Sequence, residues 1–531
     1  MKSILIAVLL SASTLPLIAQ VPDIQWQKTY GTTANESFNQ ITKTLDGNYM
    51  VCGKAGPAIS GDKTVAGAIW LLKLDTLGNI LSQYGYATIE GRNVNIIRQI
   101  RPTRDSGVVI IADVQGVGGE NEDFGILKLD KNGVVQFEQQ IEGNLSDIPM
   151  SVCQTLDNGY VLVGGSESNA GLDKTENAVG LGDDVWAVKL DSTGAIQWQN
   201  TIGGSANDYG CYVYQYQDSS FVLVATSLSD ISGDKIFNTN GGYDIWLLKL
   251  DANGNLLTQN QFGGIADDIS WNAISFPNKE VYISTYSTSG ISGNKIEMNY
   301  GFSDYWIFKI DSTGTILWQN TIGGSSQDIT MGIDVNGSGE TFIAGRSNSP
   351  MSGEKSENSM GGYDYWIVKL NAAGALEWEN TIGGSGIEDC RSIIANSDGS
   401  CIVAGISNSP ISGDKSQASV GAADFWIVKI EGSGNAPLPL DFIAFTGTLQ
   451  NNAAQLQWET ANKINVSKFE IEESSDALSF TKIGSLAATE KEQYGFTDTH
   501  LFDRNNYYRI KVIDLDQQVS YSKTILLIHS D

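Results

Sequence analysis

Histidine is almost absent from this chain: only His500 and His529 occur among its 531 residues. Because histidine is the commonest acid–base group and a frequent metal ligand, residues 23–434 lack the usual means for both chemistries. The sequence also shows no His-Glu-x-x-His motif, no nucleotide-binding loop and no cluster of metal-ligand residues. These absences argue against the common hydrolases, zinc enzymes and nucleotide-binding proteins.

Basic residues are scarce as well. The chain has 33 Lys and Arg against 61 Asp and Glu, which gives a formal net charge of −28. A field of that sign repels polyanions, so nucleic acids and anionic membranes are poor partners. After the first twenty residues, no apolar segment is long enough to cross a membrane.

Cysteine is infrequent and unpatterned. The five cysteines are Cys52, Cys153, Cys211, Cys390 and Cys401. An odd number without Cys-x-x-Cys spacing argues against a disulfide framework or a zinc site. We expect mostly buried thiols and no cofactor.

The first residues, MKSILIAVLLSASTLPLIAQ, have a lysine, a short apolar run and small residues before Ala19. This pattern is typical of a secretory signal peptide, which we assign to residues 1–19. A membrane anchor is the alternative, but the run is too short to span a bilayer comfortably. We therefore expect a protein that is secreted or displayed at the cell surface.

A sequence motif typical of a strand followed by a turn recurs seven times, as in DIWLLKLDANG and DYWIVKLNAAG. Its lysines are spaced by 55, 61 and then four times 60 residues, as their numbers show: Lys73, Lys128, Lys189, Lys249, Lys309, Lys369 and Lys429. A fixed period of this length indicates a repeat architecture.

Each repeat contains the pattern of a four-stranded meander. In the last copy, CRSIIA and CIVAGI flank Asp398-Gly399, which is a hairpin signal, and the strand DFWIVKI leads to a turn at Gly434. Earlier copies add a fourth strand, as in ILWQNTIGG. Because the strands are apolar on both faces, we expect each sheet to be covered on both sides.

These features predict an all-β fold, a seven-bladed β-propeller with about 60 residues per blade over residues 23–434. The seventh copy stops without its fourth strand, and a matching strand, IQWQKTYG around Trp26, opens the mature chain. We expect this N-terminal strand to close the ring by completing the last blade.

The repeat ends before Pro437, and the composition changes. After a linker at residues 435–440, residues 441–528 show alternating strands, a core tryptophan at Trp458, and Tyr507 near the start of NYYRIKVID. This pattern indicates a small antiparallel β-sandwich.

The segments LPLDFIAFTG, WETAN, FEIEESSDALSFTKIG and NYYRIKVIDLDQQVSYSK resemble a fibronectin type III-like module. More narrowly, they resemble the module that precedes the sorting domain in proteins exported by the type IX secretion system of Bacteroidetes. The resemblance covers about 95 C-terminal residues. It implies export to the cell surface, although the Tyr-Pro-Asn-Pro-like opening of a sorting domain does not follow here.

Long loops between the second and third strands, together with the links between blades, share one rim, where we expect any ligand to bind. Five loop acids are candidate binding residues that could help to hold Ca²⁺: Asp62, Asp173, Asp234, Glu354 and Asp414, with Asn294 in the remaining copy. The alternative is structural, an acid that caps a turn and pairs with the adjacent lysine.

A second candidate comes from asymmetry, because a ring binds one ligand only where its copies differ. Blade two lacks the long loop, and four nearby arginines could receive an anionic group such as a carboxylate: Arg92, Arg98, Arg101 and Arg104. Ion pairing on the surface is the alternative for this cluster.

The strictly repeated residues are expected to serve the fold. The strand tryptophans should pack between blades, and the repeated lysines should pair with carboxylates near the rim. An aspartate two residues before the tryptophan should hydrogen-bond the adjacent link. A catalytic group would not be copied in every blade.

The main hypothesis is a monomeric, non-enzymatic binding or adhesion protein that presents its rim to an extracellular protein or glycan. The alternative is a carbohydrate-active propeller enzyme of the glycosidase or lyase type, which would need two carboxylates at the channel mouth. A quinoprotein-like enzyme is a third reading that rests on fold analogy alone.

Overall fold

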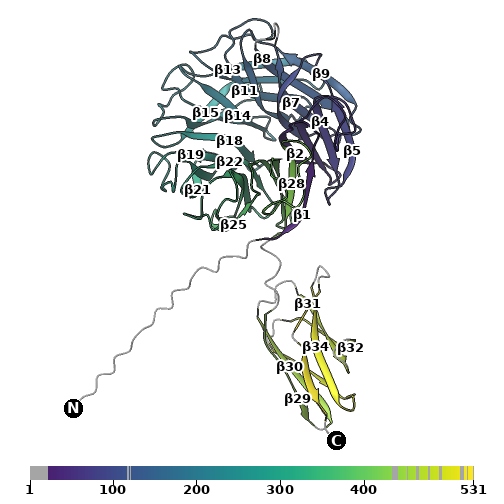
Figure 1. Ribbon diagram of the computed structural model, residues 1–531. Coiled ribbons are helices and arrows are strands. Elements are labelled where there is room, and N and C mark those ends of the chain that lie inside the picture. The colour runs from purple at the N-terminus through teal and green to yellow at the C-terminus, as the bar shows by residue number, and fades with distance from the viewer. Residues whose placement is uncertain are drawn as a thin grey trace, which may run out of the picture. The chain divides into compact units, whose positions relative to one another are not determined.

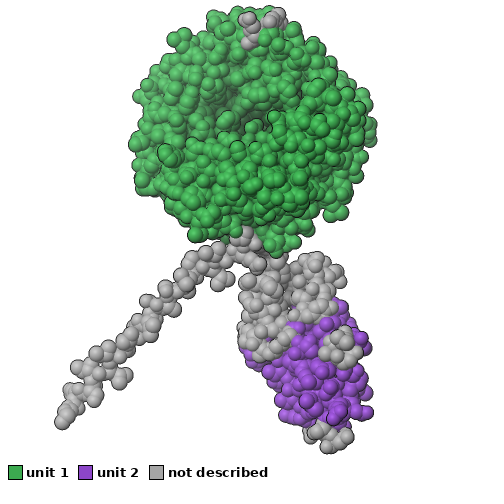
Figure 2. Space-filling model, viewed as in Figure 1, with its two compact units in different colours: residues 1–431 green, residues 432–531 purple. Residues whose placement is uncertain are grey.

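The structure is a computed structural model that describes residues 22–116, 119, 121–432, 441–450, 452–461, 466–475, 479–489, 493–514, 519–522 and 524–529. The predicted signal peptide (1–19), Gly434 and the predicted linker (435–440) lie outside these residues. The chain divides into two compact units, residues 1–431 and 432–531 (Figure 2). The described residues form strands and no helix, which confirms the all-β prediction.

The described part of unit 1 contains seven four-stranded sheets. Sheet 1 comprises β2 (Ser37–Lys43), β3 (Tyr49–Lys54), β4 (Ile69–Leu74) and β5 (Ile80–Tyr86). Sheet 2 comprises β6 (Val94–Pro102), β7 (Val108–Gln115), β8 (Glu122–Leu129) and β9 (Val135–Ile141). Sheet 3 comprises β10 (Asp147–Gln154), β11 (Tyr160–Ser166), β12 (Asp184–Leu190) and β13 (Ile196–Ile202).

The remaining sheets follow the same order. Sheet 4 comprises β14 (Asp208–Gln215), β15 (Phe221–Ser227), β16 (Asp244–Leu250) and β17 (Leu256–Phe262). Sheet 5 comprises β18 (Asp268–Ser275), β19 (Val281–Ser287), β20 (Asp304–Ile310) and β21 (Ile316–Ile322). Sheet 6 comprises β22 (Asp328–Val335), β23 (Thr341–Ser347), β24 (Asp364–Leu370) and β25 (Leu376–Ile382). Sheet 7 comprises β26 (Glu388–Ala395), β27 (Cys401–Ser407), β28 (Asp424–Ile430) and β1 (Ile24–Tyr30).

The sheets are antiparallel meanders arranged around a centre, with the first strand of each sheet innermost (Figure 1). Each first strand contacts the first strands of the sheets before and after it, and β26 contacts β2, so the inner strands form a closed ring. Figure 2 shows a hollow in the middle of the visible face of unit 1. The arrangement is propeller-like.

The N-terminal strand β1 supplies the fourth strand of sheet 7. It pairs antiparallel with β28, from Ile24 opposite Ile430 to Tyr30 opposite Phe425. Side chains extend the contact, because Trp426 Nε1 donates to Gln27 Oε1 at 3.2 Å. The two ends of the repeat region are therefore joined within one sheet, as the sequence predicts.

The repeated tryptophans are fully buried between sheets: Trp70, Trp186, Trp246, Trp306, Trp366 and Trp426. Two repeated lysines show the expected pairing with carboxylates. Lys128 and Lys189 lie 2.8 and 2.9 Å from Asp105 and Asp157, which belong to the turns between first and second strands. The tryptophans pack between sheets, as predicted, and both lysine side chains are buried.

Six of the seven junctions between sheets hold two buried acids, one at the start of the third strand of a sheet and one at or just before the first strand of the next. The pairs are Asp123 with Asp147, Asp184 with Asp208, Asp244 with Asp268, Asp304 with Asp328, Asp364 with Glu388, and Asp424 with Glu36. At the seventh junction the position before the third strand is Ala68.

One oxygen of each acid is well hydrogen-bonded. Asp244 Oδ2 accepts from the Asn240 amide at 2.7 Å, and Asp268 Oδ2 accepts from the Gly264 amide at 2.7 Å. The predicted partner of the third-strand acid was the link between sheets, but its amide partner lies in the preceding loop of its own sheet. Both Oδ1 atoms of this pair are buried without a hydrogen-bond partner.

The described part of unit 2 contains two sheets. One has the order β29 (Asp441–Gln450), β30 (Ala453–Ala461) and β33 (Gln493–Asp498). The other has the order β32 (Thr481–Ala487), β31 (Val466–Ser474), β34 (Asn505–Asp514) and β35 (Val519–Tyr521), with β36 (Ile525–Ile528) paired to β34.

The core of unit 2 contains Trp458, as predicted, together with Phe469 and Tyr508. The buried tyrosine of β34 is Tyr508, whose hydroxyl donates to Asp498 Oδ2 at 2.7 Å. Tyr507, singled out from the sequence, is only half-buried, because side chains alternate along the strand and only one of the two neighbours can face the core.

Candidate functional site

A β-bulge interrupts the first strand of every sheet in the ring. Seven residues at these bulges have no partner in the second strand: Asn39, Arg98, Met150, Cys211, Trp271, Met331 and Arg391. In β6 a second shift also leaves Asn95 without a partner. A bulge redirects the side chain of its extra residue and is common next to functional sites. These seven bulge residues are of five different types, with Met and Arg each occurring twice, although the strands around them repeat.

A cavity of about 310 Å³ lies among four of these bulge residues. Its walls come from the starts of first strands, the ends of second strands and the loop before β16, which places it at the end of the ring that carries the long loops. It is lined by Arg98, Ile148, Met150, Gly165, Tyr209, Cys211, Thr226, Tyr243, Ile269, Ser270, Trp271 and Tyr286. The walls are largely apolar and aromatic, as is usual for small-molecule sites.

The aromatic side chains differ in exposure. Trp271 is 40% exposed, although large aromatic side chains are usually buried. Tyr209 and Tyr243 lie next to each other, with ring centroids 6.3 Å apart, and Asn207 Nδ2 donates to the Tyr243 hydroxyl at 3.2 Å. The cavity therefore offers ring faces for stacking and phenol groups for hydrogen bonds.

Arg98 is the cationic group of the cavity. Its Nε and Nη2 donate to the carboxylate of Asp113 at 2.6 to 3.0 Å, and Asp113 is fully buried. Burial raises the pKa of Asp113, and the Arg98 guanidinium opposes that rise. This bidentate pair fixes the guanidinium plane and leaves Nη1 to donate to a ligand.

A second carboxyl group lies behind the wall of the cavity, next to the lining residue Tyr209. Asp183 is buried, hydrogen-bonds Tyr209, and lies before β12. Burial raises the pKa of Asp183. Such a group retains its proton closer to neutral pH than an exposed aspartate does.

Charged residues also gather where the inner strand β26 of sheet 7 meets the second strand β23 of sheet 6. Asp389 accepts from Arg391 at 2.9 Å and from Arg346 Nη1 at 3.2 Å. The Arg346 guanidinium also lies 4.8 Å from the centre of the Tyr363 ring. Arg391 is the bulge residue of β26, equivalent to Trp271 in β18.

The predicted arginine cluster does not act as a unit. Arg92 lies 3.7 Å from Glu142, and Arg104 Nη1 donates to the Thr155 carbonyl at 2.6 Å. Arg101 lines a different cavity of about 220 Å³ at the opposite end of the inner strands. Only Arg98 reaches the aromatic cavity, because residues along a β-strand point to different sides.

The predicted loop acids are spread around the ring. Four of them bind the link that enters their own sheet, as Asp234 does: its amide donates to the Gly203 carbonyl at 2.9 Å, and its carboxylate accepts from the Gly203 amide at 3.2 Å. The equivalent pairs are Asp62 with Gly31, Asp173 with Glu142, and Asp414 with Gly383, and Asn294 binds Gly263 in the same way.

Glu354 keeps the amide bond of the series, to the Gly323 carbonyl, but its carboxylate accepts from the Tyr300 hydroxyl at 2.8 Å. The described residues include no cluster of three or more His, Cys, Asp or Glu side chains that could hold a metal ion. Calcium binding by these acids stays a prediction.

The lysine after each loop acid turns inward instead of pairing with it. The six lysines are at most 2% exposed: Lys63, Lys174, Lys235, Lys295, Lys355 and Lys415. Lys235 lies 5.7 Å from the centre of the Trp246 ring, and its ammonium donates to Ser227 Oγ at 2.5 Å. The expected acid–lysine pair is therefore wrong, because the ammonium binds buried groups of its own sheet.

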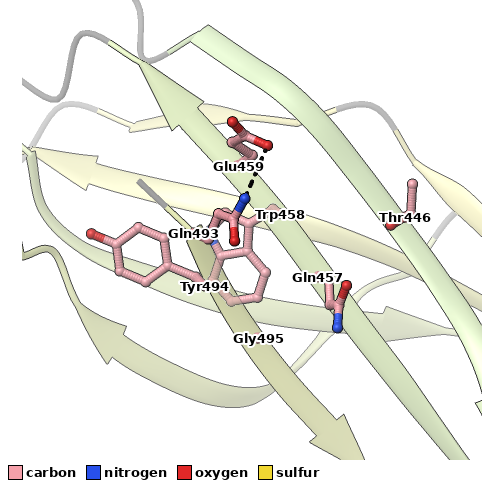
Figure 3. A pocket seen from close by; sticks show the side chains of 7 residues that line it. All are labelled: Thr446, Gln457, Trp458, Glu459, Gln493, Tyr494 and Gly495. Atoms are coloured by element: carbon pink, nitrogen blue, oxygen red, sulfur yellow. Dashed lines mark hydrogen bonds between the residues drawn. The ribbon is translucent and has the colours of Figure 1, made fainter. Parts of the chain in front are cut away.

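A hollow of about 310 Å³ also lies on unit 2 (Figure 3). Figure 3 shows Glu459 and Gln493 meeting at its edge, where Gln493 Nε2 donates to Glu459 Oε2 at 3.4 Å. Trp458 stacks on Tyr494 with ring centroids 5.7 Å apart and belongs to the core of the unit. This hollow is a depression on a polar sheet face and has no exposed aromatic wall comparable with Trp271.

The aromatic cavity residues were not predicted from the sequence. The sequence does contain a signal for them, because one position varies between copies while most flanking positions repeat. It is the third residue after the acid at the first strand, namely Asn39, Met150, Cys211, Trp271, Met331 and Arg391. Position-by-position comparison of the copies would have singled out these bulge residues.

No family model matches the chain, and no curated protein matches it. Among solved structures, an α-L-arabinanase of Penicillium chrysogenum bound to arabinobiose is similar, with 7% identity, a TM-score of 0.37, and coverage of 77% of this chain and 99% of that one. A polysaccharide lyase, Uly1, has 10% identity, a TM-score of 0.34, and coverage of 72% and 91%.

A protein of unknown function from Bacteroides caccae has 8% identity, a TM-score of 0.35, and coverage of 63% of this chain and 93% of that one. Likenesses at these TM-scores do not assign a function. The functional argument therefore rests on the cavity and its residues.

Proposed function

We propose that this chain is an exported seven-bladed β-propeller, followed by a fibronectin type III-like module, that binds a carbohydrate in the aromatic cavity at the channel mouth. The observation that carries the proposal is Trp271, a bulge residue whose ring is 40% exposed beside Tyr209, Tyr243 and Tyr286. The C–H faces of a sugar ring pack on aromatic faces, while its hydroxyls bind phenol and guanidinium groups.

Carbohydrate is favoured over a large adhesive partner by the shape of the site. The cavity volume of about 310 Å³ falls at the lower end of the range for small-ligand sites, whereas a stable protein partner needs roughly 800 Å² on each side. Of the partners expected for a binding protein, a glycan is therefore favoured over a protein, and the carbohydrate-active enzyme expected as the alternative would use the same ligand class. Export is supported by the N-terminal sequence pattern.

Replacement of Trp271 by alanine is expected to weaken saccharide binding at least about tenfold, because it removes the exposed ring face on which a sugar would stack. Isothermal titration of the full chain with a panel of neutral and acidic oligosaccharides measures this. The matched control is Leu257→Ala, which truncates an exposed side chain on outer strand β17 and should leave binding unchanged. Equal affinity of the Trp271→Ala variant and the unaltered protein would refute the location of the site.

A second candidate function is cleavage of the bound saccharide. The observation that favours it is Asp183, a buried carboxyl group with a raised pKa that hydrogen-bonds the cavity residue Tyr209. A buried carboxyl group with a raised pKa holds its proton more firmly than an exposed one, and in its protonated form it can protonate a leaving oxygen. Release of reducing ends by the unaltered chain, lost in Asp183→Asn while binding persists, would support this function.

A further inference from the structure

We propose that the saccharide bound at the mouth is acidic, with carboxylate or sulfate groups, and that Arg391, supported by Arg346, receives one of them. This inference rests on the proposed carbohydrate site and adds the chemical class of its ligand. Its basis is a cluster formed by Asp389 and Arg391 on the inner strand β26 and by Arg346 on the neighbouring strand β23.

The cluster has a charge excess. Two guanidinium groups share one carboxylate, since Arg346 and Arg391 both donate to Asp389. The adjacent Glu388 faces the other side of its strand, where it accepts from Ser407 and Ser409 and meets Asp364. The three residues of the cluster therefore carry one net positive charge in a protein whose net charge is −28.

The positive groups are also the accessible ones. The side chains of Arg391 and Arg346 are 37% and 29% exposed, whereas that of Asp389 is only 6% exposed. An approaching ligand therefore meets guanidinium N–H groups before it meets the carboxylate. Guanidinium groups form strong charge-assisted bonds to carboxylates and sulfates, with a planar geometry that suits both.

The distribution of arginine along the chain supports a role at the channel. Only eight arginines occur in the sequence, namely Arg92, Arg98, Arg101, Arg104, Arg346, Arg391, Arg504 and Arg509. Among those in the ring, Arg98 and Arg391 are both bulge residues of inner strands, and Arg346 joins Arg391 through Asp389. Arginine is thus sparse in the ring but present on the strands that line its centre.

The cluster continues the aromatic cavity around the ring. Trp271 and Arg391 occupy equivalent bulge positions on β18 and β26, and Met331 of β22 lies at the position between them. A saccharide of several units could pack one sugar on Trp271 and place an anionic substituent at Arg391. Arg98, on the other side of the cavity, would donate its remaining Nη1 group to the same chain.

The test is calorimetric titration of the full chain with three oligosaccharides of equal length: oligogalacturonate, a sulfated galactan fragment and a neutral manno-oligosaccharide. We expect at least one acidic ligand to bind about tenfold more tightly than the neutral one, with affinity that falls as salt is raised. Comparison of the two acidic ligands shows whether carboxylate or sulfate is preferred.

Arg391→Gln should lower affinity for the acidic ligand about tenfold and leave affinity for the neutral ligand unchanged, because one charge-assisted bond is lost. Arg391→Lys should retain part of the affinity and serves as a second variant if the glutamine variant folds poorly. Arg504→Gln, which removes one exposed positive charge from unit 2, is the matched control.

The failures are distinguishable. If the neutral ligand binds as tightly as the acidic ones, or Arg391→Gln has no effect on acidic binding, the inference is overturned while the carbohydrate site stands. If none of the three binds and Trp271→Ala changes no binding in the wider panel, the proposed function fails as well.

Discussion

Removal of the first strand, β1, is expected to destabilise the ring by at least about 5 kcal/mol, the largest effect predicted for any short segment. The deletion leaves β28 with an unpaired edge and removes the buried Tyr30 and the half-buried Trp26. Loss of one large buried aromatic side chain alone costs about 3 to 5 kcal/mol. Chemical denaturation followed by tryptophan fluorescence measures the loss of unfolding free energy.

The control for this deletion is a chain that begins at residue 22 and keeps the whole of β1. If the shortened chain does not fold, a synthetic peptide of residues 22–31 provides a second measurement, since binding of the missing strand should restore the folded state as its concentration rises. Full stability of the chain without β1, or no response to the peptide, would contradict closure of the ring by this strand.

The second large effect is a loss of stability as pH rises from about 4 to about 7. Six of the seven junctions bury two acids, whereas only six loop lysines are buried beside them, so one acid at each of these junctions must hold a proton for the buried charges to balance. Burial and the neighbouring Asp268 raise the pKa of Asp244 to about 7, and burial with neighbouring acids raises the pKa of Asp184, Asp304 and Asp364 to about 6.

The sign follows from proton binding in the two states. An unfolded aspartate ionises near pH 4, whereas these folded acids keep a proton until about pH 6 to 7. Between these values the folded state binds more protons, so its stability falls as pH rises, by about 1.4 kcal/mol per pH unit for each extra proton. Denaturation at a series of pH values measures this slope.

A single junction can be tested by Asp244→Asn, which imitates the protonated acid and should reduce the slope between pH 4 and 7 by about one proton. Asp251→Asn, at an exposed turn where hydrogen bonds to Asn255 hold the carboxyl pKa below its usual value, is the matched control. An unchanged slope in Asp244→Asn would show that the proton does not reside at this junction.

Periodicity made much of the ring predictable. The four-stranded meander follows from turn glycines and apolar runs, and the closing strand follows from the unmatched copy around Trp26. The exact register of the hairpin formed by β26 and β27 could not be predicted. In the structure Cys401 pairs with Ala395, and the turn extends from Asn396 to Ser400 around the positive φ of Gly399. The dihedral angles of a turn cannot be predicted from its amino-acid composition alone.

The candidate site was less predictable than the fold. The loop acids and arginines were chosen by residue type, but Asp234 and its equivalents satisfy backbone amides, and Arg104 caps a turn. Whether a carboxylate can bind a ligand depends on whether backbone amides already donate hydrogen bonds to it in the folded chain. Trp271 was not predicted because the sequence has twelve tryptophans and most of them pack in the core. Only the bulge in β18 distinguishes Trp271 from the others, and the bulge is not evident from the sequence of this strand alone.

The most direct test of the central claim is covalent labelling of the full chain with an acidic oligosaccharide that carries a photoreactive diazirine, followed by peptide mass spectrometry. Labelling is predicted at the inner-strand bulges, on peptides that contain Met150, Trp271 or Arg391, and unlabelled oligosaccharide should compete for it. Competed labelling confined to the exposed long loops, such as that around Ile231, or to unit 2 would contradict a binding site at the channel mouth.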